Sequence, residues 1–207
     1  ADITAALLTG SITANNKVYD GNTSATIATR SVTGVIGLDD VSLAGGTAVF
    51  ADKNVGNGKT VSATGLGLSG ADAANYNLAS TSASTTANIT AASLTASAIV
   101  SSKVYDGNTT ASATLAITNG LVGSETVGTS ASSTFNSKDV LTANLVTVNS
   151  VTLANGTNGG LASNYQLAAG ETAVAHITPK VLTATASKPV FHKLAWANAH
   201  TLLKLSA

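Results

Sequence analysis

Apolar residues alternate with hydroxyl-bearing residues in short runs along most of the chain. In one such run, Leu94, Ala96 and Ala98 are separated from one another by a threonine and a serine. A period of two residues is typical of a β-strand with one buried face. A helix is the alternative for so alanine-rich a chain, but Thr, Ser and Val interrupt every window and glycine recurs throughout. The pattern therefore predicts a mainly β fold, with opening strands near residues 3–12 and 89–96.

One seven-residue motif divides the chain into two units. Its first copy reads Lys17-Val18-Tyr19-Asp20-Gly21-Asn22-Thr23, and the same seven residues return at 103–109, which is 86 positions later. The units of solenoid proteins are about 20–50 residues long, so each copy here has the length of a small domain. We predict one domain over residues 1–89 and a second over 90–177. The last strand of the first is expected to run into the second without a linker.

Two further motifs follow the first one in each unit, in the same order. They are Phe-x-x-Lys and Asn-Tyr, which begin at Phe50, Asn75, Phe135 and Asn164. An acidic residue shortly before a valine is also kept between the first and second motifs. The alternation places Lys17 and Tyr19 on one face of a strand, and the Asp-Gly pair after them is a standard signal for the turn of a β-hairpin. A change of alternation between Val148 and Val151 predicts a bulge or a turn.

Residues 178–207 begin a third repeat that is not completed. The opening-strand pattern returns over 177–186, but no Asp-Gly follows Lys188. A strand without a complete domain of its own is a template for pairing with another chain, through residues such as Ile177, Val181 and Leu182. The tail beyond is either a short amphipathic helix or the ragged end of the truncated repeat. In a helix, one face would carry Ala195, Trp196, Ala199, Leu202 and Leu203.

The three ordered motifs, present twice, resemble the YDG/MBG-type repeats of large bacterial surface proteins, such as filamentous haemagglutinin-like adhesins. The resemblance covers residues 1–178. It implies Ig-like or ubiquitin-like β-rich domains in tandem, used as a stalk on a protein located outside the cell or at the bacterial cell surface. The resemblance supplies no catalytic residues.

The composition narrows the classes of partner. Charged residues make up 10% of the chain and the formal net charge is zero, so nothing favours binding to nucleic acid or to anionic lipid. The absence of cysteine excludes disulfides, zinc-thiolate sites and thiol nucleophiles. No run approaches the roughly 18 apolar residues of a membrane span. The first residues lack the features of a signal peptide, so we expect a mature product or an excised piece.

The first motif carries residue types that also occur in binding sites. Tyr19 and Tyr105 could stack on a sugar, but burial in the core, with the hydroxyl bonded to backbone, is the favoured interpretation. Side-chain oxygens that could bind calcium are found on Asp20, Asn22, Asp106 and Asn108, together with Asp39 and Asp40. A calcium site needs six or more oxygens, so turn formation explains these residues better and no cofactor is expected.

The lysines of the second motif raise the question of a covalent cross-link. Lys53 and Lys138 could form isopeptide bonds to Asn75 and Asn164, and each bond would lower the mass of the chain by one ammonia. An ordinary ion pair with an acidic residue is the favoured alternative. His176, His192 and His200 are too few, and not shared between units, for a catalytic triad or a metal centre. We therefore expect no enzymatic activity.

The sequence favours a non-enzymatic stalk repeat of a secreted or surface-attached adhesin, with neighbouring repeats of the same protein as its partners. Two alternatives stay open. One is a subunit of a self-assembling extracellular filament, or another homo-oligomer, joined by donor strand exchange through residues 177–186. The other is a module that binds a host glycan or surface receptor.

Overall fold

The alternating residues at the start of the chain form strand β1 (Ala6–Ala14), in which Leu8 and Ile12 point inward. The computed structural model describes residues 1–184. Within that range the regular structure is β, apart from two short 3-10 turns, η1 (Ala73–Asn75) and η2 (Ala162–Asn164). The predicted mainly β fold is confirmed. The helix considered for the tail, and most of residues 178–207, lie outside the described residues.

The first unit consists of two sheets. Its other strands are β2 (Lys17–Val18), β3 (Ser24–Ala25), β4 (Ile27–Thr33), β5 (Ser42–Phe50), β6 (Gly56–Ser69), β7 (Tyr76–Leu78) and β8 (Ser82–Thr90). One sheet has the order β2-β8-β6-β5-β3 and the other the order β4-β1-β7. Inward-facing side chains of both sheets, such as Ile12, Phe50 and Val61, belong to one core.

The second unit repeats this pairing scheme. Its strands are β9 (Ala92–Ser93), β10 (Thr95–Val100), β11 (Lys103–Val104), β12 (Thr110–Ala111), β13 (Ala113–Asn119), β14 (Val127–Phe135), β15 (Val146–Asn155), β16 (Tyr165–Gln166), β17 (Thr172–Ala173) and β18 (Ile177–Thr178). β9 and β10 together replace β1, and β17 and β18 replace β8. For example, β9 pairs in parallel with β16 as β1 does with β7. The bulge predicted in this unit is present, because Asn149 lies between two residues of β15 that pair with consecutive residues of β14.

The Tyr-Asp-Gly motif forms a turn, but the flanking strands do not form the predicted hairpin. β2 pairs in parallel with β8, while β3 pairs with β5, so the two strands lie at opposite edges of the five-stranded sheet. Lys17 spans these edges: its Nζ donates to Asp20 Oδ1 at 2.7 Å and to the Ser24 carbonyl at 3.1 Å. The sheet is therefore curled until its edges are within reach of one side chain.

The same lysine connects the first motif with the second. Lys17 Nζ lies 5.6 Å from the centre of the Phe50 ring, and in the second unit Lys103 Nζ lies 5.9 Å from that of Phe135. A cation over an aromatic face is attracted by the ring quadrupole. The lysine–phenylalanine contact is thus common to both units, and in the first unit the same lysine also joins the two edges of the curled sheet.

Ile177 is part of the second unit. It is buried and pairs with Lys103, as Ile89 pairs with Lys17 in the first unit. Val181 and Leu182 are exposed and belong to no strand of the described part of the chain. Of the strand predicted over 177–186, β18 contains the first two residues, and residues 179–184 are not strand.

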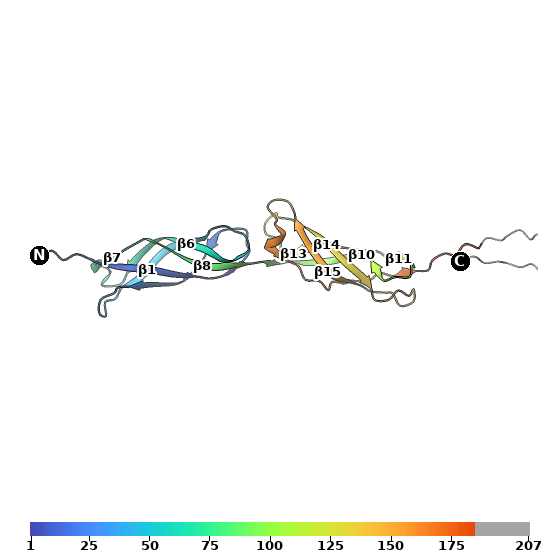
Figure 1. Ribbon diagram of the computed structural model, residues 1–207, viewed down its shortest axis with the longest axis horizontal. Coiled ribbons are helices and arrows are strands. Elements are labelled where there is room, and N and C mark those ends of the chain that lie inside the picture. The colour runs from blue at the N-terminus through green and yellow to red at the C-terminus, as the bar shows by residue number, and fades with distance from the viewer. Residues whose placement is uncertain (185–207) are drawn as a thin grey trace, which may run out of the picture.

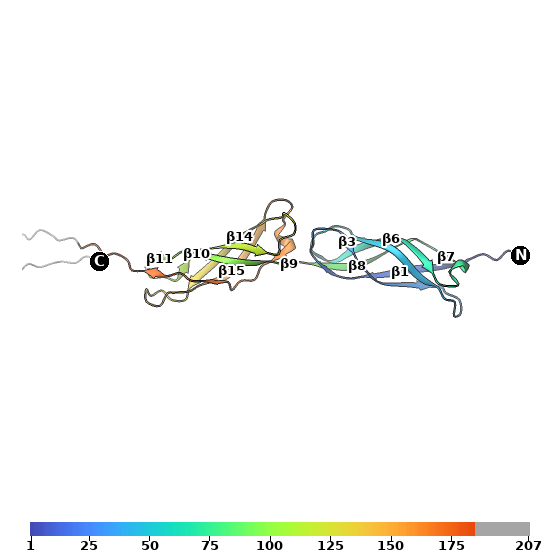
Figure 2. The ribbon, with the colours of Figure 1, turned by 180° about the vertical axis from the view of Figure 1, so that it is seen from behind.

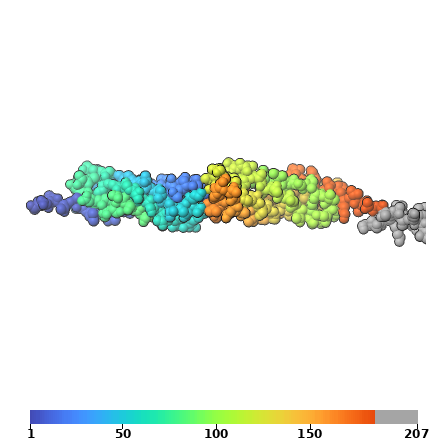
Figure 3. Space-filling view, turned by 90° about the horizontal axis from the view of Figure 1, so that it is seen from above, coloured from blue at the N-terminus to red at the C-terminus, as the bar shows by residue number. Residues whose placement is uncertain are grey.

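The two units follow one another along a single long axis, with the described chain ends at opposite ends of the rod (Figure 1). From behind, β8 of the first unit leads directly to β9 of the second (Figure 2). The space-filling view shows the segment near residue 50 against the segment near residue 165, without a gap (Figure 3). The junction is therefore a packed contact.

The role given to the lysine of the first motif predicts the behaviour of a substitution. Lys103→Met keeps an apolar stem of similar length but removes the ammonium that lies over Phe135 and bonds Asp106 and Asn108. The urea midpoint of the chain should fall without a change in the denaturant slope. Lys138→Met is the matched control, because within residues 1–184 Lys138 pairs only with exposed Asp139. Equal midpoints for the two variants would contradict a stabilising role for the lysine of the first motif.

Candidate functional site: the joint between the units

A buried carboxylate lies at the centre of the contact between the two units. Glu125, in the loop between β13 and β14, is 7% exposed. Its Oε1 accepts hydrogen bonds from the Tyr19 hydroxyl at 2.8 Å and from Lys53 Nζ at 3.0 Å, and its Oε2 accepts one from the Tyr165 hydroxyl at 2.7 Å. Tyr19 and Lys53 belong to the first unit, and Tyr165 belongs to the second. The carboxylate therefore has its full set of donors only when the units are docked.

The donors of this carboxylate also pack on one another. The Tyr19 and Tyr165 rings meet edge to face, with centroids 5.5 Å apart and planes at 81°. Lys53 Nζ lies 5.8 Å from the centre of the Tyr19 ring. Edge-to-face aromatic pairs and cation–π contacts add to the hydrogen bonds. The geometry fixes both the distance and the rotation between the units.

A second polar contact lies beside the first. Asn164, fully buried in η2, accepts a hydrogen bond from the Val55 backbone N–H at 3.0 Å. Its side-chain nitrogen donates to Asn54 Oδ1, also at 3.0 Å. Val55 and Asn54 follow directly after Lys53 in the Phe-x-x-Lys segment. All three shared motifs therefore contribute to the joint: the first two from the first unit, and Asn-Tyr from the second.

Gly21 allows the Tyr-Asp-Gly turn to approach the second unit closely. Its φ of 81° lies in the left-handed region, and a Cβ at this position would come within 2.8 Å of Val122 Cγ1. Both observations favour glycine there. Val55 and Val122 also pack against the same apolar cluster, which includes core residues of both units. The hydrophobic core is continuous across the joint.

The joint shifts the pKa values of its own groups. Burial would raise the pKa of Glu125, but hydrogen bonds from Tyr165, Tyr19 and Lys53 outweigh it and the pKa is lowered. Burial, then the bond to Glu125, raises the pKa of Tyr165 to about 12 and raises that of Tyr19 as well. The bond to Glu125 raises the pKa of Lys53. The stable form is thus a carboxylate with two neutral tyrosines and one ammonium.

The two tyrosines predicted as candidate sugar platforms lie in different surroundings. Tyr19 is buried in the joint, and its hydroxyl bonds the Glu125 side chain instead of the backbone group that was expected. Tyr105 is 36% exposed at the far end of the second unit. Sequence reasoning could not separate the two copies, because the difference comes from the neighbouring unit.

Of the six residues considered for calcium, Asp39 and Asp40 accept from the Tyr76 hydroxyl and the Ala71 N–H, and the other four surround a lysine ammonium. Asp20 Oδ1 and Asn22 Oδ1 accept from Lys17 Nζ at 2.7 and 3.1 Å, and Asp106 and Asn108 accept from Lys103 Nζ in the same way. Each aspartate also accepts from the backbone N–H two residues later, as in an Asx turn. Within residues 1–184, no group of three His, Cys, Asp or Glu residues could hold a metal ion.

Three of the four residues considered for cross-links form ion pairs or hydrogen bonds. Lys53 is paired with Glu125, Lys138 with Asp139 at 2.8 Å, and Asn164 with Asn54. Asn75 is exposed at the end of η1. The structure brings Lys53 and Asn164 to the same joint. Lys138 lies near the outer end of the second unit, and Asn75 lies near the outer end of the first.

Glu125 is the functional residue that sequence reasoning missed. One signal in the sequence was the acidic residue kept before a valine in both units. The counterpart of Glu125, 86 positions earlier, is Asp39, whose Oδ2 accepts from the Tyr76 hydroxyl at 2.7 Å. A second signal is the Asn-Tyr motif, which supplies Tyr165 and Tyr76. Combining the two would have indicated an acid–tyrosine pair at one end of every unit.

These observations define a tandem β-repeat protein whose second unit holds the first through a buried carboxylate. The sequence profile of the YDG domain matches residues 4–87 and again 85–173, so the chain belongs to the YDG domain family. No curated protein matches the chain, and no solved structure matches it. Among the described residues, no helix has both the length and the apolar character to cross a membrane.

The hydrogen bond from Tyr19 to Glu125 can be tested by removing one oxygen atom. Tyr19→Phe keeps the ring but leaves Glu125 one donor short, so the free energy of unfolding should fall by about 1.5–3 kcal/mol, the range for a hydrogen bond to a charged group. Tyr105→Phe makes the same change at the exposed copy and should cost less than about 0.5 kcal/mol. Urea unfolding of both variants measures the difference. Equal costs would contradict the joint.

The pKa shifts predict how docking depends on pH. The pKa of Glu125 is lowered from its ordinary 4.5, so its contribution is present above that pH and is lost as the pH falls through the lower folded value. The pKa values of Tyr19 and Tyr165 are raised from 10, so their contributions are present below pH 10 and are lost on further increase toward about 12 for Tyr165.

The free energy of unfolding, measured against pH, should therefore decline below about pH 4.5 and above about pH 10. Glu125→Gln provides the control, because an amide does not titrate. This variant should be less stable at neutral pH and should lose part of the decline on the acid side. An acid profile identical to that of the native chain would show that Glu125 does not carry the effect.

Proposed function

We propose that this chain is a non-enzymatic stalk segment of a secreted or surface-attached bacterial adhesin, in which YDG units act as a semi-rigid spacer. The observation that carries the proposal is the Glu125 carboxylate, whose donors come from both units. A spacer must keep its ends apart, and it can do so only if its units do not rotate freely about their junctions. The joint provides that restraint.

Three features of the junction support stiffness. β8 ends at Thr90 and β9 begins at Ala92, so a single residue separates the strands of the two units. The polar contacts of Glu125 and Asn164 lie beside this connection and oppose bending and rotation about it. The core is also continuous across the junction. Inter-domain motion is the default for small interfaces, and buried apolar contact of this kind limits it.

The state of the polar groups supports a structural role over catalysis. The buried side-chain nitrogens and oxygens of the described residues all have hydrogen-bond partners. At the joint, both tyrosine hydroxyls and Lys53 are bonded to the Glu125 carboxylate. A glycan platform repeated in each unit is disfavoured too, because Tyr19 is 3% exposed. Of the two motif tyrosines, Tyr105 is the one whose ring is exposed enough to stack on a sugar.

A filament subunit is the second candidate, and one observation favours it. Leu182 aligns with Leu8 and Leu94, which are buried in the opening strands of the first and second units, yet Leu182 itself is 73% exposed. An exposed apolar residue in the register of an opening strand could enter another chain by strand exchange. Ile177 cannot take part without leaving the second unit, where it pairs with Lys103.

The stalk function is tested by measuring the stiffness of the joint. The chain has no cysteine, so Ser84→Cys and Ser130→Cys would place one spin label on an exposed position of each unit. Pulsed electron paramagnetic resonance should give a single narrow distribution of distances between the labels. Adding Glu125→Gln should broaden it, whereas adding Asp39→Asn, the same type of change outside the joint, should not. A broad distribution in the labelled chain with Glu125 intact would contradict the stalk.

A further inference from the structure

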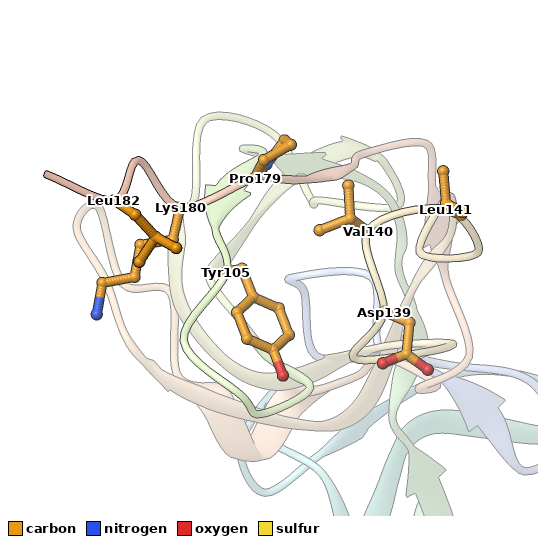
Figure 4. Close-up of a pocket in the computed structure, with 7 residues that line it drawn as sticks. All are labelled: Tyr105, Asp139, Val140, Leu141, Pro179, Lys180 and Leu182. Atoms are coloured by element: carbon orange, nitrogen blue, oxygen red, sulfur yellow. The ribbon is translucent and has the colours of Figure 1, made fainter. Parts of the chain in front are cut away.

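The outer face of the second unit carries an apolar hollow around Tyr105. The hollow has a volume of about 580 Å³ and is lined by Tyr105, Asp139, Val140, Leu141, Pro179, Lys180 and Leu182. The Tyr105 ring lies between Val140 and Leu141 on one side and Lys180 and Leu182 on the other (Figure 4). Leu141 is 97% exposed. Such an exposed apolar surface is typical of an interaction site.

This face is the counterpart of the surface that the first unit uses in the joint. Tyr105, Lys138 and Val140 occupy the motif positions of Tyr19, Lys53 and Val55. Within residues 1–184 the Tyr105 hydroxyl makes no hydrogen bond, and Lys138 contacts Asp139 instead of a carboxylate of another unit. The second unit thus presents the donor half of a joint.

The outer face of the first unit carries the acceptor half. Asp39 accepts from the Tyr76 hydroxyl at 2.7 Å, as Glu125 accepts from Tyr165. The Ile36 N–H donates to the Tyr76 hydroxyl at 3.0 Å, as the Val122 N–H donates to Tyr165 at 3.1 Å. A hollow of about 310 Å³ adjoins this pair, with Asn75, the counterpart of Asn164, on its wall. Within the described residues, Asp39 lacks the second tyrosine and the lysine that Glu125 has.

We propose that the two outer faces are complementary, so that a second copy of this chain docks head to tail, with Tyr105 and Lys138 of one copy on Asp39 of the next. The internal joint, on which the proposed stalk function also rests, shows which groups would meet. Lys138 would pair with Asp39, and Asn75 would meet the Val140 N–H and Asp139. Because the faces differ, the contact is heterologous and can continue from copy to copy.

Two features set the strength and form of this contact. The internal joint is strengthened by the covalent connection, which for short linkers corresponds to an effective concentration in the millimolar range. Separate copies lack the covalent connection, so we expect their association to be weak. Its dissociation constant should be on the order of millimolar or smaller. In the internal joint, the chain after Thr90 enters the next unit beside β16. A second copy already has its own β1 beside β7, so residues 179–184 must move away from the hollow on docking.

Complementation between two variants of the full chain tests the proposal. Asp39→Asn removes the acceptor charge and keeps the donor face, while Tyr105→Phe removes the donor hydroxyl and keeps the acceptor. By sedimentation at up to millimolar concentration, the native chain should form a series of oligomers. Each variant alone should associate at least about tenfold more weakly than the native chain. Their mixture should restore native affinity but stop at dimers, because one end of each variant is blocked.

Several results would overturn the proposal. These are a native chain that remains monomeric, variants that associate like the native chain, or a mixture no heavier than either variant alone. Leu182→Asp separates face docking from strand exchange: face docking leaves residue 182 outside the contact and survives, whereas loss of association in this variant would assign it to strand exchange. Asp39→Asn and Tyr105→Phe leave the Glu125 joint intact. If head-to-tail association is not observed, the narrow distribution of spin-label distances expected for the stalk would therefore be unaffected.

Discussion

The structure depends on a carboxylate that is buried only because two units share it. Removing an ionised carboxylate from water is costly unless donors replace the lost water. Tyr165 supplies one donor from within the second unit, and Tyr19 and Lys53 supply the others from the first. Any rotation that separates the units leaves Glu125 with a single protein donor. The carboxylate therefore selects one orientation between units, which an apolar contact alone would define less sharply.

The first motif has two roles, carried by residues two positions apart: Lys17 stabilises its own unit, and Tyr19 contacts the next unit. Lys17 turns into its own unit, where it joins the sheet edges over Phe50. Tyr19 passes beyond the unit and reaches Glu125. Because both residues are fixed by the same turn, the unit cannot close its sheet without presenting the tyrosine at its end. The first unit therefore has a direction: Tyr19 meets Glu125 at one end, and the Asp39–Tyr76 pair lies at the other.

The sequence predicts the β class, the two units and a bulge or turn between Val148 and Val151, because each depends on local alternation or on the repeat. The strand order was beyond its reach. Parallel pairs such as Lys17 with Ile89 join residues far apart in the chain, so the Asp-Gly turn was misinterpreted as a hairpin. The role of Glu125 was hidden for the same reason, since its bond to Tyr19 spans 106 positions. The different surroundings of Tyr19 and Tyr105 could not be predicted either, because they arise from the contact between the two units.

The scarcity of aromatic residues gives the joint a further importance. Aromatic side chains are 4% of the chain, so each unit has a thin core. Two of these side chains, Tyr19 and Tyr165, pack on one another at the joint between the units. In repeat proteins the stability of a unit is the sum of its own term and those of its interfaces. Tyr19, which has a neighbouring unit against it, is 3% exposed, whereas Tyr105, which faces no further unit within residues 1–184, is 36% exposed. Stability and stiffness should therefore increase together along an array, because the same contacts supply both.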